Sequence, residues 1–143
     1  MLVSQILKTK SAGVIFIAPG ATVAEAAEIL SAKRIGALIV SSDGTRCDGI
    51  LSERDIVREL GKRGAEVLAD KVSSLMTARV VGCGTGDLTI DVLQQMTDGR
   101  FRHMPVLEGD RMLAVISIGD VVKARLEELA AEKDALEGMI KGF

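Results

Sequence analysis

The stretch Gly49-Ile-Leu-Ser-Glu-Arg-Asp-Ile-Val57 is repeated in similar form as Ala114-Val-Ile-Ser-Ile-Gly-Asp-Val-Val122, and this repeat indicates the fold. A second matching pair, Val3-Ser-Gln-Ile-Leu7 and Val72-Ser-Ser-Leu-Met76, lies ahead of these segments in each half. The chain is therefore a tandem repeat of a unit of roughly 60 residues. A unit of that size buries too little apolar surface to be comfortable alone, so we expect the two copies to share one core. Clefts between two such copies are the first place to look for a ligand.

The composition is that of one compact domain or two small fused units. The chain has 143 residues, of which 48% are hydrophobic, and its formal net charge is −2. No apolar run approaches the ~20 residues that span a bilayer, and the N-terminus lacks the pattern of a signal peptide. Cys47 and Cys83 lie far apart in the sequence, which favours a buried structural thiol at each position. We therefore expect a cytoplasmic protein that has no membrane partner.

The residue types that enzymes and nucleic-acid-binding proteins depend on are scarce. The sequence has a single histidine, His103, and aromatic residues make up 2% of it. It contains no metal-binding spacing of His and Cys, no nucleophile elbow and no glycine-rich phosphate loop. Binding nucleic acid without sequence preference needs a basic track and usually aromatic rings. The sequence therefore favours a binding protein over an enzyme, requires no metal, and disfavours nucleic acid as a partner.

Apolar periodicity and turn residues predict the order strand, helix, strand, strand, helix for the first copy. Thr22 is the expected N-cap of the first of these helices. The face of that helix expected to point inward carries Val23, Ala26, Ala27 and Leu30. The expected elements are a strand at 14–17, this helix, strands at 35–40 and 46–51, and a helix from Ser52 to about Gly61. The segment 61–64 is expected to break the last helix and begin the connection to the second copy.

The second copy repeats this order. Its expected elements are a strand at 79–82, a helix at 87–98, strands at 102–107 and 112–116 around a turn at 108–110, and a helix from Ser117. Val92, Leu93 and Met96 take the inward places of Ala26, Ala27 and Leu30, so these positions stay apolar while their sizes change. We divide the chain into a first unit at 1–64 and a second unit at 65–143. The fold class is α+β.

The last helix is longer than its counterpart and carries an apolar stripe. The stripe has steps of three and four residues and is interrupted at Lys133. Its members are Val122, Leu126, Leu129, Leu136 and Ile140. Packing against the protein's own surface is the expected role, and a dimer seam is the alternative. A little over two heptads is too short to be a stable coiled coil alone.

The repeated Ser-x-x-Asp, Ser52 with Asp55 and Ser117 with Asp120, is the main candidate for chemistry. It has a structural interpretation, because a serine N-cap and an acid three residues later form a capping box. It also has a functional one. A helix N-terminus attracts phosphate, the serine adds a donor, and a carboxylate can accept both hydrogens of a ribose diol. Each copy would then present half of a nucleotide site.

Basic residues close to these motifs fit a phosphate-binding site. Arg54 lies inside the first Ser-x-x-Asp, and Lys8 and Lys10 lie in the opening segment. Arginine suits bidentate contact with phosphate. A second basic group precedes a predicted strand and comprises Arg100, Arg102 and His103. A solvated basic loop is the alternative for each of them, and a hydrogen-bonded position at a strand edge is the alternative for His103.

These motifs resemble the tandem cystathionine-β-synthase (CBS) domain pair, or Bateman module. The resemblance rests on Gly-Ile-Leu-Ser-Glu-Arg-Asp at 49–55, Val-Ile-Ser-Ile-Gly-Asp at 115–120, Arg-His-Met-Pro-Val at 102–106 and Val-Ser-Ser-Leu-Met-Thr at 72–77. It extends from Val3 to about Leu126, and the chain is similar to the small stand-alone bacterial members. It implies two β-α-β-β-α units related by a pseudo-twofold axis, packed through their sheets, and a homodimer.

The resemblance also implies a function. Such modules bind adenosine-containing ligands in the clefts between their units, here AMP, ADP or ATP, with NAD(H) or S-adenosylmethionine as further candidates. It implies that Asp55 and Asp120 hold ribose hydroxyls, with Ser52 and Ser117 assisting. It places Arg54, Arg102 and His103 at phosphate, and Lys10 and Thr77 more loosely along the site. The implied role is a regulatory sensor that shifts the conformation of a dimer and acts on an unknown protein target.

The second copy departs from the family pattern where Ala114 replaces the motif glycine, Gly49 in the first copy. If the glycine admits a ligand closely, the site that contains Ser117 and Asp120 is tighter or altered, and the two sites need not bind the same nucleotide. A second class of function stays open. In that class the clefts are empty, Ser-x-x-Asp serves only as a cap, and the chain is a structural or protein-interaction module.

Overall fold

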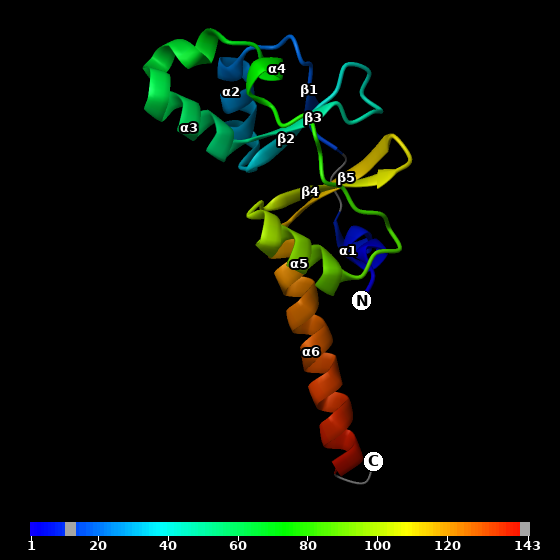
Figure 1. Ribbon diagram of the computed structural model, residues 1–143. Coiled ribbons are helices and arrows are strands. Elements are labelled where there is room, and N and C mark those ends of the chain that lie inside the picture. Colours follow the sequence, from blue (N-terminus) through cyan, green and yellow to red (C-terminus); the bar gives the residue numbers. More distant parts are fainter. Residues whose placement is uncertain (11–13, 141–143) are drawn as a thin grey trace.

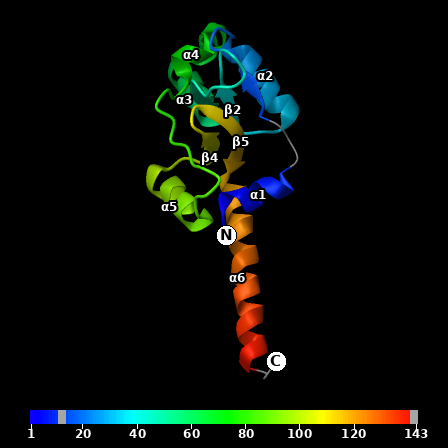
Figure 2. The same ribbon diagram turned by 90° about the vertical axis from the view of Figure 1, so that its right-hand side faces the viewer.

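The computed structural model describes residues 1–10 and 14–140 and shows two α/β units stacked on each other, with one long helix extending away from them (Figure 1). The view turned by 90° shows the same stacking, and α6 stays clear of the rest of the chain over most of its length (Figure 2). The elements in chain order are α1 (Val3–Thr9), β1 (Phe16–Ile17), α2 (Val23–Lys33), β2 (Ala37–Val40), β3 (Gly49–Ser52), α3 (Glu53–Arg63), the 3-10 helix η1 (Gly64–Ala69), α4 (Val72–Leu75), α5 (Thr89–Gly99), β4 (His103–Glu108), β5 (Arg111–Ser117) and α6 (Ile118–Ile140).

The first unit contains a three-stranded sheet in the order β1-β2-β3. β1 pairs parallel with β2, and β2 pairs antiparallel with β3, so that Leu38 lies opposite Leu51. All of β2 is buried, because successive side chains point to opposite faces and both faces are covered. Leu38 and Val40 join the core of the first unit. Ile39, also fully buried, lies outside that cluster, and the alternation turns it toward the second unit.

The second unit has the predicted hairpin but not the predicted first strand. β4 and β5 pair antiparallel over their whole length, with a register shift between Val106 and Leu107. The strand predicted at 79–82 is wrong: that segment pairs with no strand, and the contact with β4 is a single parallel bridge between Cys83 and Val106. The reason is that the backbone hydrogen bonds to β4 come only from the next residue, Cys83. The N–H of Cys83 donates to Pro105, and its carbonyl accepts from Leu107.

The helix ends agree with the predictions. Thr22 accepts a hydrogen bond from the backbone of Glu25, as an N-cap does. The break predicted at 61–64 is confirmed, and it falls at Gly64, because α3 continues through Gly61 to Arg63. The chain leaves the helix at Gly64, whose φ of 73° is a backbone conformation that glycine adopts without strain. η1 then follows directly and leads into the connection between the two units.

The protein has two hydrophobic clusters rather than the single shared core that we expected. α1 lies in the first half of the sequence, yet its Val3 and Ile6 belong to the cluster of the second unit. α4 lies in the second half, yet its Val72 belongs to the cluster of the first unit. The division at residues 64 and 65 therefore remains a proposal about the sequence repeat. In space, the two units exchange their first helices.

α6 packs against the body only at its beginning. Val121 and Ala124 are its buried residues, and the helix contacts α5, β5 and α1. All five members of the predicted apolar stripe are exposed, from 40% for Val122 to 85% for Ile140. The prediction that the stripe packs against the protein's own surface is therefore wrong. None of the helices in the described part of the chain is long and apolar enough to cross a membrane.

The two cysteines differ in burial. Cys83 is buried, as predicted, and burial raises the pKa of its thiol to about 11. Cys47 is only half-buried, so the prediction of a buried thiol is wrong there. Its thiol lies on the loop that leads into β3, where its Sγ donates to the carbonyl of Gly49. Both cysteines are free.

Gly49 is the point at which the linker crosses the first sheet. The linker residue Thr77 forms an antiparallel bridge with Ile50 of β3. The two residues exchange backbone hydrogen bonds of 3.0 and 2.9 Å. A β-carbon added at Gly49 would lie 2.7 Å from the Met76 sulfur and 2.9 Å from the Thr77 carbonyl oxygen. The glycine therefore admits the linker, and it lines neither of the clefts described below.

We predict that Gly49→Ala destabilises the protein by about 1–3 kcal/mol, because a rigid backbone oxygen must move to admit the methyl group. Gly61→Ala is the matched control. Gly61 lies within α3 with nothing within 4 Å of an added β-carbon, and there alanine is the better helix former. Urea unfolding of both variants measures the difference. Equal midpoints for the two would show that the linker does not need the glycine.

Candidate functional site

Two clefts lie between the units, and each combines the start of a helix from one unit with a loop from the other. The first cleft, of about 350 Å³, combines the start of α3 with residues 99–103. The second, of about 330 Å³, combines the start of α6 with residues 34–37. Both volumes lie in the range of small-molecule sites. This reciprocal arrangement is what a pseudo-twofold axis between two repeats produces.

The first cleft contains the first Ser-x-x-Asp, and its two residues form a complete capping box. The backbone N–H of Ser52 donates to Asp55 Oδ2 at 2.9 Å, and the N–H of Asp55 donates to Ser52 Oγ at 3.3 Å. Arg58, one turn along α3, donates to Asp55 Oδ1 at 2.8 Å. Asp55 is buried although it carries a charge, and these partners offset the loss of hydration.

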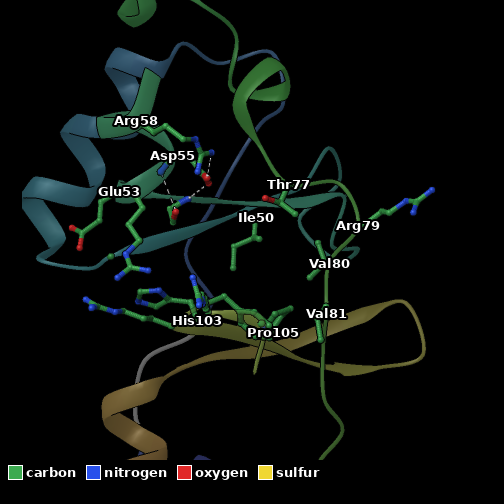
Figure 3. A pocket seen from close by; sticks show the side chains of 17 residues that line it. Ile50, Glu53, Asp55, Arg58, Thr77, Arg79, Val80, Val81, His103 and Pro105 are labelled. Carbon is green, nitrogen blue, oxygen red and sulfur yellow. Dashed lines mark hydrogen bonds and ion pairs between the residues drawn. The ribbon is translucent and has the colours of Figure 1, made fainter. Parts of the chain in front are cut away.

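The opposite walls of the first cleft are partly apolar. Thr77, Val80 and Val81 come from the linker, and Ile50 comes from β3. Figure 3 shows Asp55 and Arg58 on the α3 side, His103 and Pro105 on β4 facing them, and the linker closing one end. Thr77 is held in place by its bridge to Ile50. The cleft therefore presents a polar end at α3 and an apolar slot between β3, the linker and β4.

The first cleft is rich in positive charge, and we call it the arginine-rich cleft. Only two of its lining residues are acidic, Glu53 and Asp55. Arg58 is committed to Asp55, and Arg79 extends away at the open edge (Figure 3). The arginines that line the cleft are Arg54, Arg58, Arg79, Arg100 and Arg102. A cleft with this balance suits an anion of several charges.

The second cleft contains the second Ser-x-x-Asp, and we call it the Lys10 cleft. The N–H of Ser117 donates to Asp120 Oδ2 at 2.8 Å, and the N–H of Asp120 donates to Ser117 Oγ at 3.1 Å. Lys10 Nζ donates to the same Asp120 oxygen at 2.8 Å. Burial raises the pKa of Asp120, but the hydrogen bonds from Lys10 and Ser117 outweigh it and bring that pKa below its ordinary value.

His103 lies in the wall between the two clefts and lines both of them. It approaches Gly36 of the other unit so closely that a β-carbon there would lie 2.8 Å from His103 Cε1. Burial lowers the pKa of His103, with Glu53 acting in the opposite direction and Lys10 adding to the decrease. The imidazole is therefore neutral at pH 7 and available as a hydrogen-bond donor to either cleft.

The structure distributes the nine predicted site residues over both clefts. The arginine-rich cleft receives Ser52, Arg54, Asp55, Thr77, Arg102 and His103. The Lys10 cleft receives Lys10, Ser117, Asp120 and again His103. Lys8, also considered as a basic residue, is exposed on α1 and lines neither cleft. Their roles toward a ligand stay predictions. The capping box expected on structural grounds does form in both units.

Two arginines that line the clefts, Arg58 and Arg34, were not among the predicted site residues. Arg58 was missed because its link to Asp55 depends on one turn of α3. Arg34 was missed because its helix end showed no motif. Arg34 and Arg100 end α2 and α5, and both have positive φ, 54° and 55°. Glycine or asparagine is the usual residue there. The signal lay in the repeat: the helix that precedes the central strand ends on an arginine in both copies.

The expectation that the motif glycine, Gly49, lies against a ligand is wrong. Gly49 admits the linker, as described above, and neither Gly49 nor its counterpart Ala114 lines a cleft. Ala114 is buried in the core of the second unit. The difference between the two clefts comes instead from their charges. Within the described residues, no group of three or more His, Cys, Asp or Glu side chains could hold a metal ion.

Comparison with known proteins gives a consistent family match. A CBS domain model matches residues 3–62 and again residues 72–127. The mitochondrial CBS domain-containing protein CBSX3 of Arabidopsis thaliana is 33% identical over 85% of the chain. A second Arabidopsis protein, CBSCBSPB3, is 27% identical over 88% of the chain. The chain spans only 61% and 23% of the length of these two relatives.

Solved structures share the fold. A CBS-domain-containing protein from Agrobacterium tumefaciens has a TM-score of 0.83 and 42% identity, covering 87% of this chain and 99% of its own. The CBS domain pair of protein MJ0100, in complex with 5′-methylthioadenosine and S-adenosyl-L-methionine, has a TM-score of 0.78 and 20% identity, covering 90% and 98%. CBSX2 in complex with AMP has a TM-score of 0.72 and 22% identity, covering 88% and 96%.

We predict that Lys10→Gln raises the pKa of Asp120, because the variant removes a cation that favours the carboxylate while burial continues to oppose it. A carboxylate with a lowered pKa in the folded state adds stability that is lost as pH falls through that pKa. When the pH falls below 3.8, the ordinary pKa of an aspartate, the free energy of unfolding should therefore decrease less for the variant than for the wild type. Carbon-13 NMR titration of the Asp120 carboxyl measures the shift directly.

Lys8→Gln is the control, since Lys8 is exposed on the same short helix. It removes the same charge without touching the Lys10 cleft. An Asp120 pKa that is the same in both variants would show that the ion pair with Lys10 does not form in solution.

Proposed function

Because this chain belongs to the CBS domain family and carries two CBS units in tandem, we propose that it is a regulatory module that binds an adenosine-containing ligand between the units. AMP, ADP and ATP are the leading ligands, with NAD(H) and S-adenosylmethionine as further candidates. Ligand binding shifts the conformation of a homodimer and is read by a protein target. Members of this family with paired CBS domains are generally regulatory rather than catalytic.

The observation that carries the proposal is the repeated helix start in each cleft. Ser52 with Asp55, and Ser117 with Asp120, place a hydroxyl and a carboxylate at the N-terminus of a long helix. The carboxylate suits a ribose diol, as acidic residues do in dinucleotide sites. Arginines across the cleft suit phosphate. The apolar slot lined by Ile50, Val80 and Val81 suits a purine ring.

The known ligands of structural relatives support the same class. The MJ0100 domain pair is solved with two adenosine derivatives and CBSX2 with AMP. Those chains are 20% and 22% identical to this one, so they support the fold and suggest the ligand class. The identity of the nucleotide is therefore proposed from the clefts of this chain.

The charges assign different ligands to the two clefts. In the arginine-rich cleft we assign Asp55 to ribose, with Ser52 assisting, and Arg54, Arg102 and His103 to phosphate, with Thr77 along the edge. In the Lys10 cleft the basic residues are Arg34 and Lys10, and Lys10 is already paired with Asp120 at 2.8 Å. A ribose that reached Asp120 would compete with Lys10, which could then turn to a single phosphate. We therefore assign ligands with more phosphates to the arginine-rich cleft.

A ligand in either cleft contacts both units at once. In the arginine-rich cleft, Asp55 belongs to the first unit and Arg102 to the second. Binding changes the conformational equilibrium only if the ligand binds one arrangement of the units better than another. A ligand that spans both units fulfils that condition when their separation or angle differs between states. The homodimer and the target protein would then report the change.

One observation favours the alternative, a protein-interaction module with empty clefts. Both capping boxes are complete without a ligand, and Asp55 and Asp120 already have basic partners. In this alternative the two motifs only stabilise helix starts, which contributes about 1 kcal/mol each. The two functions differ in what replacement of the carboxylates does.

We predict that AMP, ADP or ATP raises the melting temperature, and that Asp55→Asn and Asp120→Asn each remove the part due to their own cleft. At 100 times its dissociation constant, a ligand stabilises a one-site protein by about 2.7 kcal/mol, which corresponds to roughly 5–10 °C. Asparagine keeps an oxygen for the cap, so the unliganded variants should stay folded. Thermal shift followed by calorimetric titration measures both effects.

Asp91→Asn is the matched control, because Asp91 lies exposed in the first turn of α5 and lines neither cleft. It should bind like the wild type. If no adenosine ligand binds the wild type at millimolar concentration, the sensor function fails and the interaction module stands. If both cleft variants bind with unchanged affinity, the clefts are the wrong sites.

We predict that phosphate binding in the arginine-rich cleft raises the pKa of His103, so that binding is accompanied by proton uptake as pH falls from 7 toward 6. The free protein holds that pKa below its ordinary value through burial, and a nearby phosphate favours the imidazolium. The complex then binds more protons than the free protein, so affinity should increase as pH falls from 7 toward 6. Calorimetry in buffers of different ionisation enthalpy counts the protons.

His103→Gln isolates this effect, because the phosphate's own titration is common to both proteins and His103 is the only histidine. The difference between wild type and variant should be a net uptake of up to one proton per bound ligand. Identical proton counts would place the phosphate away from His103.

A further inference from the structure

α6 leaves the body of the protein with an apolar face that the described chain does not cover. Its last buried residue is Ala124, and the helix continues to Ile140. Figures 1 and 2 show this part extending away from both units in two perpendicular views. The exposed large apolar residues on it are Val122, Leu126, Leu129, Leu136, Met139 and Ile140, with exposed fractions of 40–85%.

The apolar face is not a continuation of the face that packs against the body. Each residue turns an α-helix by about 100°. Val121, Ala124 and Glu128 share the direction of the body, whereas the stripe is centred about a third of a turn away. Its positions are Val122, Leu126, Leu129, Lys133, Leu136 and Ile140, spaced as the a and d positions of a heptad. We call this set the α6 stripe. It is over 25 Å long at about 1.5 Å per residue.

We propose that the α6 stripe is an interface with the α6 stripe of a second copy of this chain, with the two helices antiparallel. The partner is a second copy because the charges beside the stripe are complementary to themselves. This inference does not rest on nucleotide binding. It locates a contact between two copies on α6, which continues past the end of the second matched CBS unit at residue 127.

Lys133 disfavours the parallel arrangement. In a parallel pair in register, the same a position of both helices meets at the interface. Lys133 would then face Lys133 of the second copy, and like charges at close range repel. In the antiparallel pair an a position lies beside a d position, so Lys133 lies next to a leucine. Its stem can cover that leucine while its ammonium group reaches solvent.

The charges that flank the stripe also favour the antiparallel pair. Lys123 and Glu137 both occupy e positions, at equal distances of seven residues on either side of Ala130. Antiparallel helices bring Lys123 of each copy to Glu137 of the other, which gives two opposite-charge pairs, against one repulsive pair where the Glu132 residues of the two copies meet near the middle. A parallel pair would instead bring Glu132 of each copy to Glu137 of the other, which gives two repulsive pairs.

The folded body makes a short interface of this kind feasible. A stripe of this length is too short for a stable coiled coil of two free peptides, because helix nucleation is costly. Here Val121 and Ala124 anchor the start of α6 in the core of the second unit, so nucleation is complete before association. The contact remains small, and we expect association that depends on protein concentration in the micromolar range.

Leu129→Asp tests the interface, with Ala131→Asp as the matched control. Leu129 lies in the middle of the stripe, and Ala131 is exposed on the opposite side of the same helix. Both variants add one carboxylate to the exposed part of α6. We expect Leu129→Asp to weaken association by about 100-fold or more, since each dimer loses two buried leucines. Sedimentation equilibrium at several concentrations measures it.

The expected result is a dissociation constant for self-association that is the same for wild type and Ala131→Asp and about 100-fold higher for Leu129→Asp. Removal of the α6 contact weakens association even if the same two copies also touch through their units. Equal dissociation constants for all three proteins would overturn the proposal. Circular dichroism of Leu129→Asp checks that the helix itself remains.

A charge exchange tests the antiparallel direction. Lys123→Glu alone and Glu137→Lys alone should each associate roughly 10-fold more weakly than wild type at low salt. An equimolar mixture should recover, because both pairs between positions 123 and 137 in the mixed dimer are again opposite in charge. If the mixture associates as weakly as the separate variants, the antiparallel pairing is wrong. If the wild-type protein shows no association that Leu129→Asp weakens, the interface is wrong.

Discussion

Each hydrophobic core of this protein is completed by a helix from the other half of the sequence. α1 inserts Val3 and Ile6 into the second unit, and α4 inserts Val72 into the first. A unit of roughly 60 residues gains apolar contacts from this exchange that it cannot supply itself. The same exchange fixes where the connecting segments run. The linker must cross β3 at Gly49, and this crossing places Thr77 at the edge of the arginine-rich cleft.

The two Ser-x-x-Asp motifs form capping boxes, and in the proposed sites the same atoms would also contact the ligand. Capping holds each serine and aspartate at a helix start, and the backbone N–H of the serine donates to the carboxylate. A side chain that is already held in one rotamer loses little entropy when a ligand arrives. Capping of the helix and contact with a ligand are therefore compatible in the same motif. What differs between the clefts is the basic partner, Arg58 in one and Lys10 in the other.

The proposed ligand sites and the proposed α6 interface occupy different parts of the molecule but share an element. α6 begins at the Lys10 cleft, where Asp120 lies in its first turn, and extends beyond the body as the α6 stripe. A ligand that moved the start of α6 would also move the far end of a rigid helix, and by a larger distance. If both proposals hold, α6 connects the clefts mechanically to the second copy.

The repeat, the order of most elements, the caps at Thr22 and Ser52, and nine residues that line the clefts could be predicted from the sequence, because these depend on local spacing and residue type. The exchange of α1 and α4 and the loss of the strand at 79–82 could not. These depend on contacts between segments far apart in the chain. The same holds for the site. Only the tertiary structure brought Arg58, Arg34 and Arg100 to the clefts, turned His103 toward Gly36, and left the α6 stripe uncovered, since which surfaces meet is decided by packing and not by periodicity.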